Sequence, residues 1–118
     1  MGVCLKLFRW KKGRQNSGYD KMLLAGSKRF LLPFDLYLLR FTKGAEVPLH
    51  KDPIKKGQHH RLNVVLKKAT KGGEFVCTEV IWQSERIKYF RSDIAEHAVT
   101  RVEKGTRYVL SLGWVRQA

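Results

Sequence analysis

Two histidines and one aspartate stand at a spacing that suits metal binding. His50 and Asp52 form an H-x-D pair, and His97 follows 45 residues after Asp52. Residues two apart on an extended chain project from the same face, so we expect His50 and Asp52 to lie side by side at the end of a strand. Two imidazoles and one carboxylate make the facial triad that holds non-haem Fe(II) and leaves three coordination positions open. These three side chains are the predicted metal ligands and catalytic centre.

The chain around these residues has the pattern of short strands. Apolar or alternating runs recur at roughly 8–12-residue spacing between turn residues, and strongly helical stretches are scarce. We therefore predict an all-β sandwich or jelly roll with at least eight strands and little helix. Loops are expected at 11–18 and 51–60, a break is expected at Gly26 and Ser27, and 19–24 is ambiguous between helix and strand. The expected strands are 3–10, 35–42, 46–50, 61–67, 74–77, 79–82, 86–90, 97–102 and 106–115.

Length and charge narrow the class of protein. The 118 residues suit a single domain, 1–118, and 43% of them are hydrophobic, which argues against a disordered chain. Lys and Arg total 24 against 10 acidic residues, for a formal net charge of +14. A charge of this size attracts nucleic acid, acidic protein or another anionic macromolecule, although it also serves solubility.

The motifs taken together resemble the 2-oxoglutarate/Fe(II)-dependent dioxygenases, in particular their prolyl-hydroxylase-like branch. Arg107 stands ten residues after His97, so the chain carries the family's order H-x-D, H and R. The resemblance covers about residues 35–115, two-thirds of the chain, and leaves 1–34 as basic, supporting N-terminal strands. Two further segments carry it: Gly72 to Phe75 (GGEF) resembles the branch's glycine turn between the ligands, and 97–108 resembles its closing H-x-V…G-x-R-Y segment.

The resemblance implies a fold, a near-minimal double-stranded β-helix, which is a cupin-like jelly roll with little helix. It also implies cofactors, a cosubstrate and a reaction. It implies that Fe(II) is bound by the three predicted ligands, and that Arg107 pairs with the distal carboxylate of 2-oxoglutarate, for which a guanidinium offers a bidentate, permanent charge. O2 is the second cosubstrate, and the product is a hydroxylated C–H bond, or a demethylated group where the carbon is attached to nitrogen. The branch favours a protein side chain as substrate, and the charge of the chain keeps nucleic acid as the alternative.

Two further residues are candidates for the cosubstrate pocket. Asn63 stands in the apolar run RLNVVL, where a lone amide needs a specific partner, so it either lines the pocket or is a buried structural amide. The branch has a tyrosine ten residues before the first ligand, and this chain has Arg40 there. Either Arg40 takes a polar role at that position, or Tyr37 substitutes from a shifted register.

The segment after the first two ligands is densely basic. Lys51, Lys55 and Lys56 are followed by His59, His60 and Arg61. We expect His59 and His60 at the end of a loop near the mouth of the site, since adjacent residues on a strand point to opposite faces and cannot easily share a metal. The segment either guides an anionic substrate or is a solvated loop. The N-terminal basic residues, interleaved with Phe8, Trp10 and Tyr19, have the composition of a single-strand nucleic-acid binder or of a strand with an exposed basic face.

Two other classes of protein fit part of this pattern. The first is a non-catalytic basic β-module that binds nucleic acid, in which the triad has no role. The second is a cupin-like protein with another metal and no cosubstrate, such as an isomerase or a sugar-binding module, in which Arg107 has little consequence. Cys4 and Cys77 form no metal-binding or disulfide pattern, and no signal peptide or apolar run of membrane-spanning length is evident. We therefore expect a cytoplasmic protein with no membrane partner.

Overall fold

The computed structural model describes residues 8–13, 18–27 and 33–117, which form strands and loops and no helix. This part of the chain accordingly has no helix that could span a membrane. The strands are β1 (Trp10–Lys12), β2 (Tyr19–Ser27), β3 (Phe34–Phe41), β4 (Val47–His50), β5 (Gln58–Lys67), β6 (Lys71–Gly72), β7 (Phe75–Cys77), β8 (Trp82–Gln83), β9 (Ile87–Arg91), β10 (His97–Val99), β11 (Val102–Lys104) and β12 (Arg107–Arg116).

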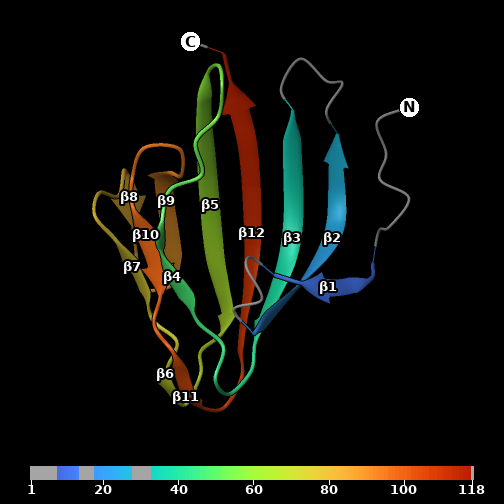
Figure 1. Ribbon diagram of the computed structural model, residues 1–118, viewed down its shortest axis with the longest axis vertical. Helices are drawn as coiled ribbons and strands as arrows, with labels where there is room; N and C mark the ends of the chain where they lie inside the picture. Colours follow the sequence, from blue (N-terminus) through green and yellow to red (C-terminus); the bar gives the residue numbers. More distant parts are fainter. Residues whose placement is uncertain (1–7, 14–17, 28–32, 118) are drawn as a thin grey trace.

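One large and two small sheets make up the fold. The large sheet has seven strands in the order β1-β2-β3-β12-β5-β9-β8, a second sheet has the order β4-β10-β7, and β11 pairs with β6. Figure 1 shows the three-stranded sheet beside the β5 and β9 side of the large sheet, while β2 and β3 extend past it. Strands distant in sequence are thus neighbours, as in β12 between β3 and β5, and the all-β jelly roll predicted from the alternation is present.

The core lies between the sheets, and the alternation along each strand selects its members. In β12, the residues at 107, 109, 111 and 113 are buried, and those between them are partly exposed. Val109 packs in one cluster with Phe41, Val65 and Val102, and each of these is less than a tenth exposed. Burying one such side chain contributes about 1.5–3 kcal/mol, so this cluster stabilises the packing of the two layers.

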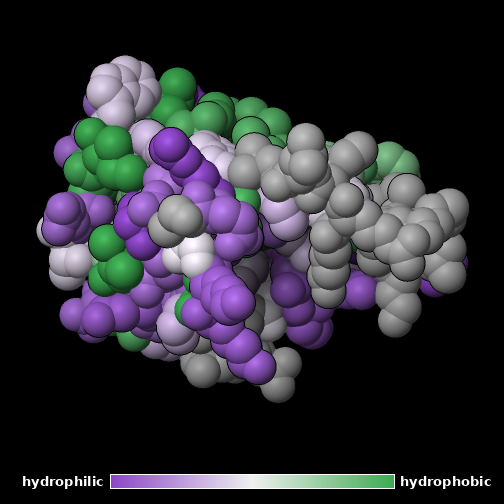
Figure 2. Space-filling model, turned by 90° about the horizontal axis from the view of Figure 1, so that it is seen from above, coloured by the Kyte–Doolittle hydropathy of each residue, from purple (hydrophilic) through white to green (hydrophobic). Residues whose placement is uncertain are grey.

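The other face of the large sheet is also apolar. Leu38 of β3, Leu110 of β12 and Val64 of β5 stand in register on it and are half-buried. Farther along the sheet, Trp114 stacks on His60, with ring centroids 5.5 Å apart, and Tyr89 lies 5.7 Å from each of these two rings. Figure 2 shows a band of hydrophobic surface along one long side of the molecule. Trp114 therefore belongs to a ring stack on this outer face, where it contacts neither the core cluster nor a substrate pocket.

Several local expectations are wrong. Lys11 and Lys12 belong to β1 instead of a loop, β2 continues through Gly26 and Ser27, and β5 begins at Gln58, before the end of the predicted loop 51–60. Of the expected strand 79–82 only Trp82 is in a strand, β8, and the expected strand 97–102 is divided between β10 and β11. The reason is pairing, because hydrogen bonds to a neighbouring strand override weak local preferences. Gly26 and Ser27, for example, are paired with Asp35 and Phe34 of β3. Of the expected strand 3–10, residues 3–7 lie outside the described part of the chain.

Candidate metal centre

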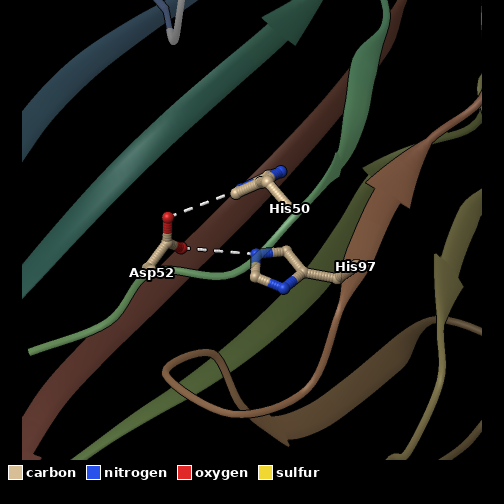
Figure 3. Close-up of side chains that lie close together, drawn as sticks. All are labelled: His50, Asp52 and His97. Carbon is tan, nitrogen blue, oxygen red and sulfur yellow. Dashed lines mark ion pairs between the residues drawn. The ribbon is translucent and has the colours of Figure 1, made fainter.

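The structure brings His50, Asp52 and His97 together. The Nε2 atom of His50 lies 3.5 Å from one carboxylate oxygen of Asp52, and the Nε2 atom of His97 lies 3.3 Å from the other. Figure 3 shows the Asp52 carboxylate pointing toward both imidazoles. One ligand atom from each residue falls within 4.8 Å of the others, a separation that suits three ligands of one metal ion.

Strand pairing positions these side chains. His50 of β4 and His97 of β10 are directly opposite each other in the small sheet, so their side chains share a face, with ring centroids 4.3 Å apart. Asp52 follows β4, where its backbone N–H donates to the carbonyl of Ser92 at 2.8 Å. The Phe90 ring of β9 lies 4.9 Å from the His97 ring and covers it on the core side. The cluster therefore consists of two imidazoles fixed by strand pairing and a carboxylate whose residue is fixed by a backbone hydrogen bond.

The hydrogen bonds of the two histidines define their tautomers. The Nδ1 atom of His50 lies 2.7 Å from the carbonyl oxygen of Pro48, and that of His97 lies 2.9 Å from the carbonyl oxygen of Ala95. A carbonyl oxygen only accepts, so Nδ1 of each ring carries the proton and Nε2 keeps a lone pair in the neutral form. Both Nε2 lone pairs are then available on the Asp52 side. A backbone carbonyl at the distal nitrogen is the usual support for a metal-binding histidine.

A cavity of about 410 Å³ connects this cluster with Arg107. The Arg107 side chain is only 6% exposed, and burial lowers the pKa of its guanidinium. One Nη atom donates to the carbonyl oxygen of Gly73, but Nε is buried and has no hydrogen-bond partner among the described residues. An unsatisfied, desolvated cation of this kind is costly, so its environment suits an anion that enters the cavity.

The backbone of the turn at Gly72 and Gly73 explains why the GGEF segment has glycine at its first two positions. Both residues have positive φ, 74° at Gly72 and 65° at Gly73, a backbone conformation that side chains disfavour. A Cβ atom on Gly72 would overlap the carbonyl oxygen of Arg101, and one on Gly73 would come within 2.8 Å of Val102. The turn directs the Gly73 carbonyl toward Arg107, so these glycines fix the guanidinium by its only described hydrogen bond.

A polar network forms one wall of the same cavity. Asn63 is buried, and its amide oxygen accepts a hydrogen bond from the Ser111 hydroxyl at 2.6 Å. Ser111 in turn accepts one from Arg61 at 2.7 Å, and Arg61 also forms an ion pair with Asp35 at 2.8 Å. Arg61 can lie flat on β12 because a Cβ atom on Gly113 would overlap its guanidinium. Asn63 thus has the specific partner expected of a buried amide, and it also lines the cavity.

The side chains of Tyr37 and Arg40 lie on opposite faces of β3. Tyr37 lines the cavity, with the ammonium group of Lys21 lying 5.4 Å from its ring centroid. Arg40 lies on the outer face, where it forms an ion pair with Asp20 at 3.0 Å and stacks on Trp10 at 4.0 Å. The first alternative, a polar role for Arg40 at the pocket, is therefore wrong, because one residue of shift along a strand changes the face.

His59 and His60 are strand residues, which corrects their expected place in a loop. His59 lines the cavity, where its Nδ1 atom lies 2.8 Å from the Ser92 hydroxyl, and burial lowers its pKa. His60 points to the outer face, between the Tyr89 hydroxyl at Nδ1 and the Gln58 amide oxygen at Nε2, and burial lowers its pKa as well. The two adjacent histidines therefore face opposite sides of the sheet, as residues next to each other on a strand must.

The sequence did not point to Lys21 and Ser111, which line the cavity. His59 and Arg61, expected in a basic segment near the mouth of the site, line the cavity itself. For the second pair one signal was available, since His59, Arg61 and Asn63 are two residues apart and share a face on a strand. The same signal was available for Ser111, since Arg107, Val109 and Ser111 are also two residues apart on one strand. For Lys21 no such signal existed, because only the pairing of β2 with β3 brings it to the site.

The comparison with solved structures identifies the fold. The chain is similar to a cupin 2 conserved barrel domain protein from Rhodopseudomonas palustris, with a TM-score of 0.57 and 11% identity over 99% of this chain and 74% of that one. It is also similar to the viral collagen prolyl hydroxylase of Paramecium bursaria Chlorella virus-1, solved as its 2OG complex, with a TM-score of 0.54 and 18% identity over 74% of this chain and 61% of that one.

A third similar structure is the Rhodobacter sphaeroides SigE complex with the anti-sigma ChrR, with a TM-score of 0.53 and 18% identity over 96% of this chain. The chain spans about half of that neighbour, 52% of its length. No family and no curated protein matches the sequence itself. The fold is therefore a cupin-like jelly roll, and the His50, Asp52 and His97 side chains form a group in it that could hold a metal ion.

Proposed function

We propose that this protein is an Fe(II)- and 2-oxoglutarate-dependent dioxygenase that hydroxylates a C–H bond of a macromolecular substrate, in particular a protein side chain. The observation that carries the proposal is the coexistence, in one cavity, of a His-Asp-His ligand set and a buried arginine with an unsatisfied Nε. The similarity in fold to a viral collagen prolyl hydroxylase supports the choice of protein as the substrate class.

The ligand set suits a ferrous ion. His50 and His97 each offer an Nε2 lone pair, because their Nδ1 protons are donated to backbone carbonyls. Asp52 adds one negative charge, and a set of three such ligands leaves the other coordination positions open. When bound, Fe(II) with 2-oxoglutarate and O2 supplies an oxidant that converts C–H to C–OH and releases succinate and CO2. The protein contributes the fixed geometry and the partly apolar walls around the ligands.

Arg107 suits the cosubstrate because of charge. Fe(II) bound by one carboxylate keeps a net charge of +1, and 2-oxoglutarate brings −2. The remaining negative charge lies on the distal carboxylate, which needs a cation inside the cavity. Arg107 is that cation, and a carboxylate at Nε would provide the hydrogen bond that the described residues do not. Asn63 and Tyr37, which line the same cavity, are assigned to the cosubstrate pocket.

The test is an anaerobic titration of the purified protein with Fe(II) and then 2-oxoglutarate. We expect the weak visible metal-to-ligand charge-transfer band of a chelated 2-oxo acid, and its loss in His97→Ala. His60→Gln is the matched control, since His60 is an equally buried histidine on the opposite face of the sheet. Succinate formed under air then measures turnover.

A metal-dependent cupin without a cosubstrate is the alternative, favoured by the similarity to a cupin barrel protein. It predicts metal binding by the same three ligands, no charge-transfer band, and no effect of Arg107→Met on the bound metal. A protein that binds Fe(II) but shows no band at saturating 2-oxoglutarate would decide for this alternative.

A further inference from the structure

Two lysines face each other across the edge of the large sheet. Lys11 of β1 and Lys21 of β2 are directly paired, so their side chains lie on one face with Cβ atoms about 5 Å apart. That face is the inner one, because Lys21 is in register with Leu39 and Val109 and lines the cavity. Like charges directly opposite on a sheet are destabilising, so this pair of lysines does not contribute to stability and requires another explanation.

The outer face of the same strands is arranged differently. There Asp20 lies between Lys12 and Arg40, at 3.7 Å from the first and 3.0 Å from the second. All ten acidic side chains of the protein lie in the described part of the chain. Within that part, no ion pair involves Lys11 or Lys21. The chain thus neutralises the basic groups on one face of β1 and β2 and leaves those on the cavity side without an acid.

The charges of the residues that line the cavity also leave Lys21 without an opposite charge. Its charged lining residues are Lys21, Arg61, Arg107 and Asp52. The charge of Arg61 is neutralised by Asp35 at 2.8 Å. With Fe(II) and 2-oxoglutarate bound as proposed above, the metal, the cosubstrate, Asp52 and Arg107 sum to zero. Lys21 is the surplus charge, and it lies on β2, which extends past the three-stranded sheet (Figure 1).

We infer that Lys21, with Lys11 beside it, binds an acidic group of the substrate, and that the substrate segment is an acidic peptide. The inference rests on the proposed function, because the surplus of charge is counted with Fe(II) and 2-oxoglutarate in place. The peptide would enter on the β1–β2 side, with carboxylates at the two ammonium groups and its reacting residue directed along the cavity toward the metal ligands.

The aromatic rings of this region favour a peptide over a single-stranded nucleic acid. Binders of single strands stack bases on accessible aromatic faces. Here Tyr19 is stacked on Phe41, with centroids 4.9 Å apart, and Gly13 stands so close to its ring that a Cβ atom would overlap it. Trp10 lies on the outer face under Arg40. Tyr37, on the cavity side, lies under the Lys21 ammonium group, 5.4 Å from its ring centroid, and Phe8, 65% exposed, is the open ring of this region. The Tyr19, Trp10 and Tyr37 rings are therefore engaged within the protein, whereas a carboxylate needs only the ammonium groups.

The experiment compares three fluorescein-labelled probes by anisotropy, with the Fe(II)- and 2-oxoglutarate-loaded protein under anaerobic conditions. The probes are a peptide of six glutamates around a central proline, the same peptide with glutamines, and a ten-nucleotide oligothymidylate. The variants are Lys21→Met and, as the matched control, Lys12→Met. Both remove one positive charge and keep the aliphatic stem, but Lys12 points to the outer face and pairs with Asp20.

We expect the glutamate peptide to bind about tenfold more tightly than the glutamine peptide, since a charge-assisted hydrogen bond is worth about that factor. Lys21→Met should abolish about that tenfold preference, and Lys12→Met should change it less than about twofold. Equal binding of the two peptides to the unchanged protein, or equal losses in the two variants, would overturn the inference. So would tighter binding of the oligothymidylate that depends on Lys21.

The failure of this inference differs from a failure of the proposed function. The charge-transfer band of the loaded protein and its slow oxidation of 2-oxoglutarate without substrate report the proposed function alone. Both are measured on the unchanged protein, before any peptide is added. If the band is absent from the unchanged protein, the proposed function is wrong. If the band is present in the unchanged protein and Lys21→Met leaves the peptide preference unchanged, only the inference is wrong.

Discussion

The substitution Arg107→Met gives the most discriminating prediction, because its effect on the unfolding free energy should change sign when Fe(II) and 2-oxoglutarate are bound. In the empty cavity Arg107 is a cation that is 6% exposed, with one hydrogen bond to Gly73 and an unsatisfied Nε. Arg107→Met keeps an unbranched apolar stem and removes the charge. An unsatisfied buried polar atom costs about 1–3 kcal/mol, and a small void left by the shorter side chain offsets part of the gain. We therefore expect the variant to be about 1–2 kcal/mol more stable than the unchanged protein without metal or cosubstrate.

The order should reverse when the site is filled. At a 2-oxoglutarate concentration a hundred times its dissociation constant, binding stabilises the unchanged protein by about 2.7 kcal/mol. The Met variant lacks the cation that holds the distal carboxylate and should gain almost nothing. The unchanged protein is then about 1 kcal/mol the more stable of the two, a crossing that a purely structural arginine would not produce.

The assay is urea unfolding followed by tryptophan fluorescence, with a chelator in one series and with Fe(II) and 2-oxoglutarate under anaerobic conditions in the other. Arg101→Met is the control, since Arg101 is exposed and should change the unfolding free energy by less than about 0.5 kcal/mol in both series. The reasoning is refuted if Arg107→Met lowers stability in the chelator series, or if it retains the stabilisation by 2-oxoglutarate.

Three further predictions follow from the same contacts. Asp52→Ala should weaken Fe(II) binding by more than about a hundredfold and leave the far-ultraviolet circular dichroism unchanged, because the residue lies in a loop and its loss removes the one carboxylate of the ligand set; unchanged Fe(II) affinity would contradict the assignment. Gly113→Ala should cost about 2–4 kcal/mol in urea unfolding, because its Cβ displaces Arg61 and breaks the bonds that Arg61 makes to Ser111 and Asp35; a neutral result would show that Arg61 has another accessible position. Burial lowers the pKa of His60, so at acidic pH the unfolded chain binds a proton that the folded chain does not. The unfolding free energy should therefore fall as the pH drops below about 6.5, the ordinary pKa of histidine. His60→Gln should make this decrease smaller, and an equal decrease in the variant would contradict the prediction.

Much of the fold could be predicted from the sequence because its strands alternate clearly. In β12, each second residue from Arg107 to Gly113 is buried, and the residue types over 106–115 alternate with the same period. Wrong expectations at Lys11, at Gly26 and at the start of β5 fall where local preference is weak. At these places the partner strand decides, and the partner is distant in sequence.

The candidate ligands illustrate what a short spacing can determine. His50 and Asp52 are close because they are two residues apart, and their types already indicate a metal. The approach of His97 depends on its pairing with His50 across β4 and β10, a contact between segments 47 residues apart. Its place in the order of motifs indicates the role, but only the folded sheet gives the Nε2 separation and the Nδ1 hydrogen bonds to Pro48 and Ala95.

The sequence by itself determined the residue types, the period of the strands and the excess of positive charge. Those properties are local or additive, so one chain displays them without knowledge of its neighbours. The tertiary structure decided which charges meet. It placed Arg40 with Asp20 on the outer face, Lys11 opposite Lys21 on the inner one, and Arg107 in a cavity where its Nε has no described partner. Desolvation and ion pairing depend on distances across strands, and only the register of the sheets sets those distances.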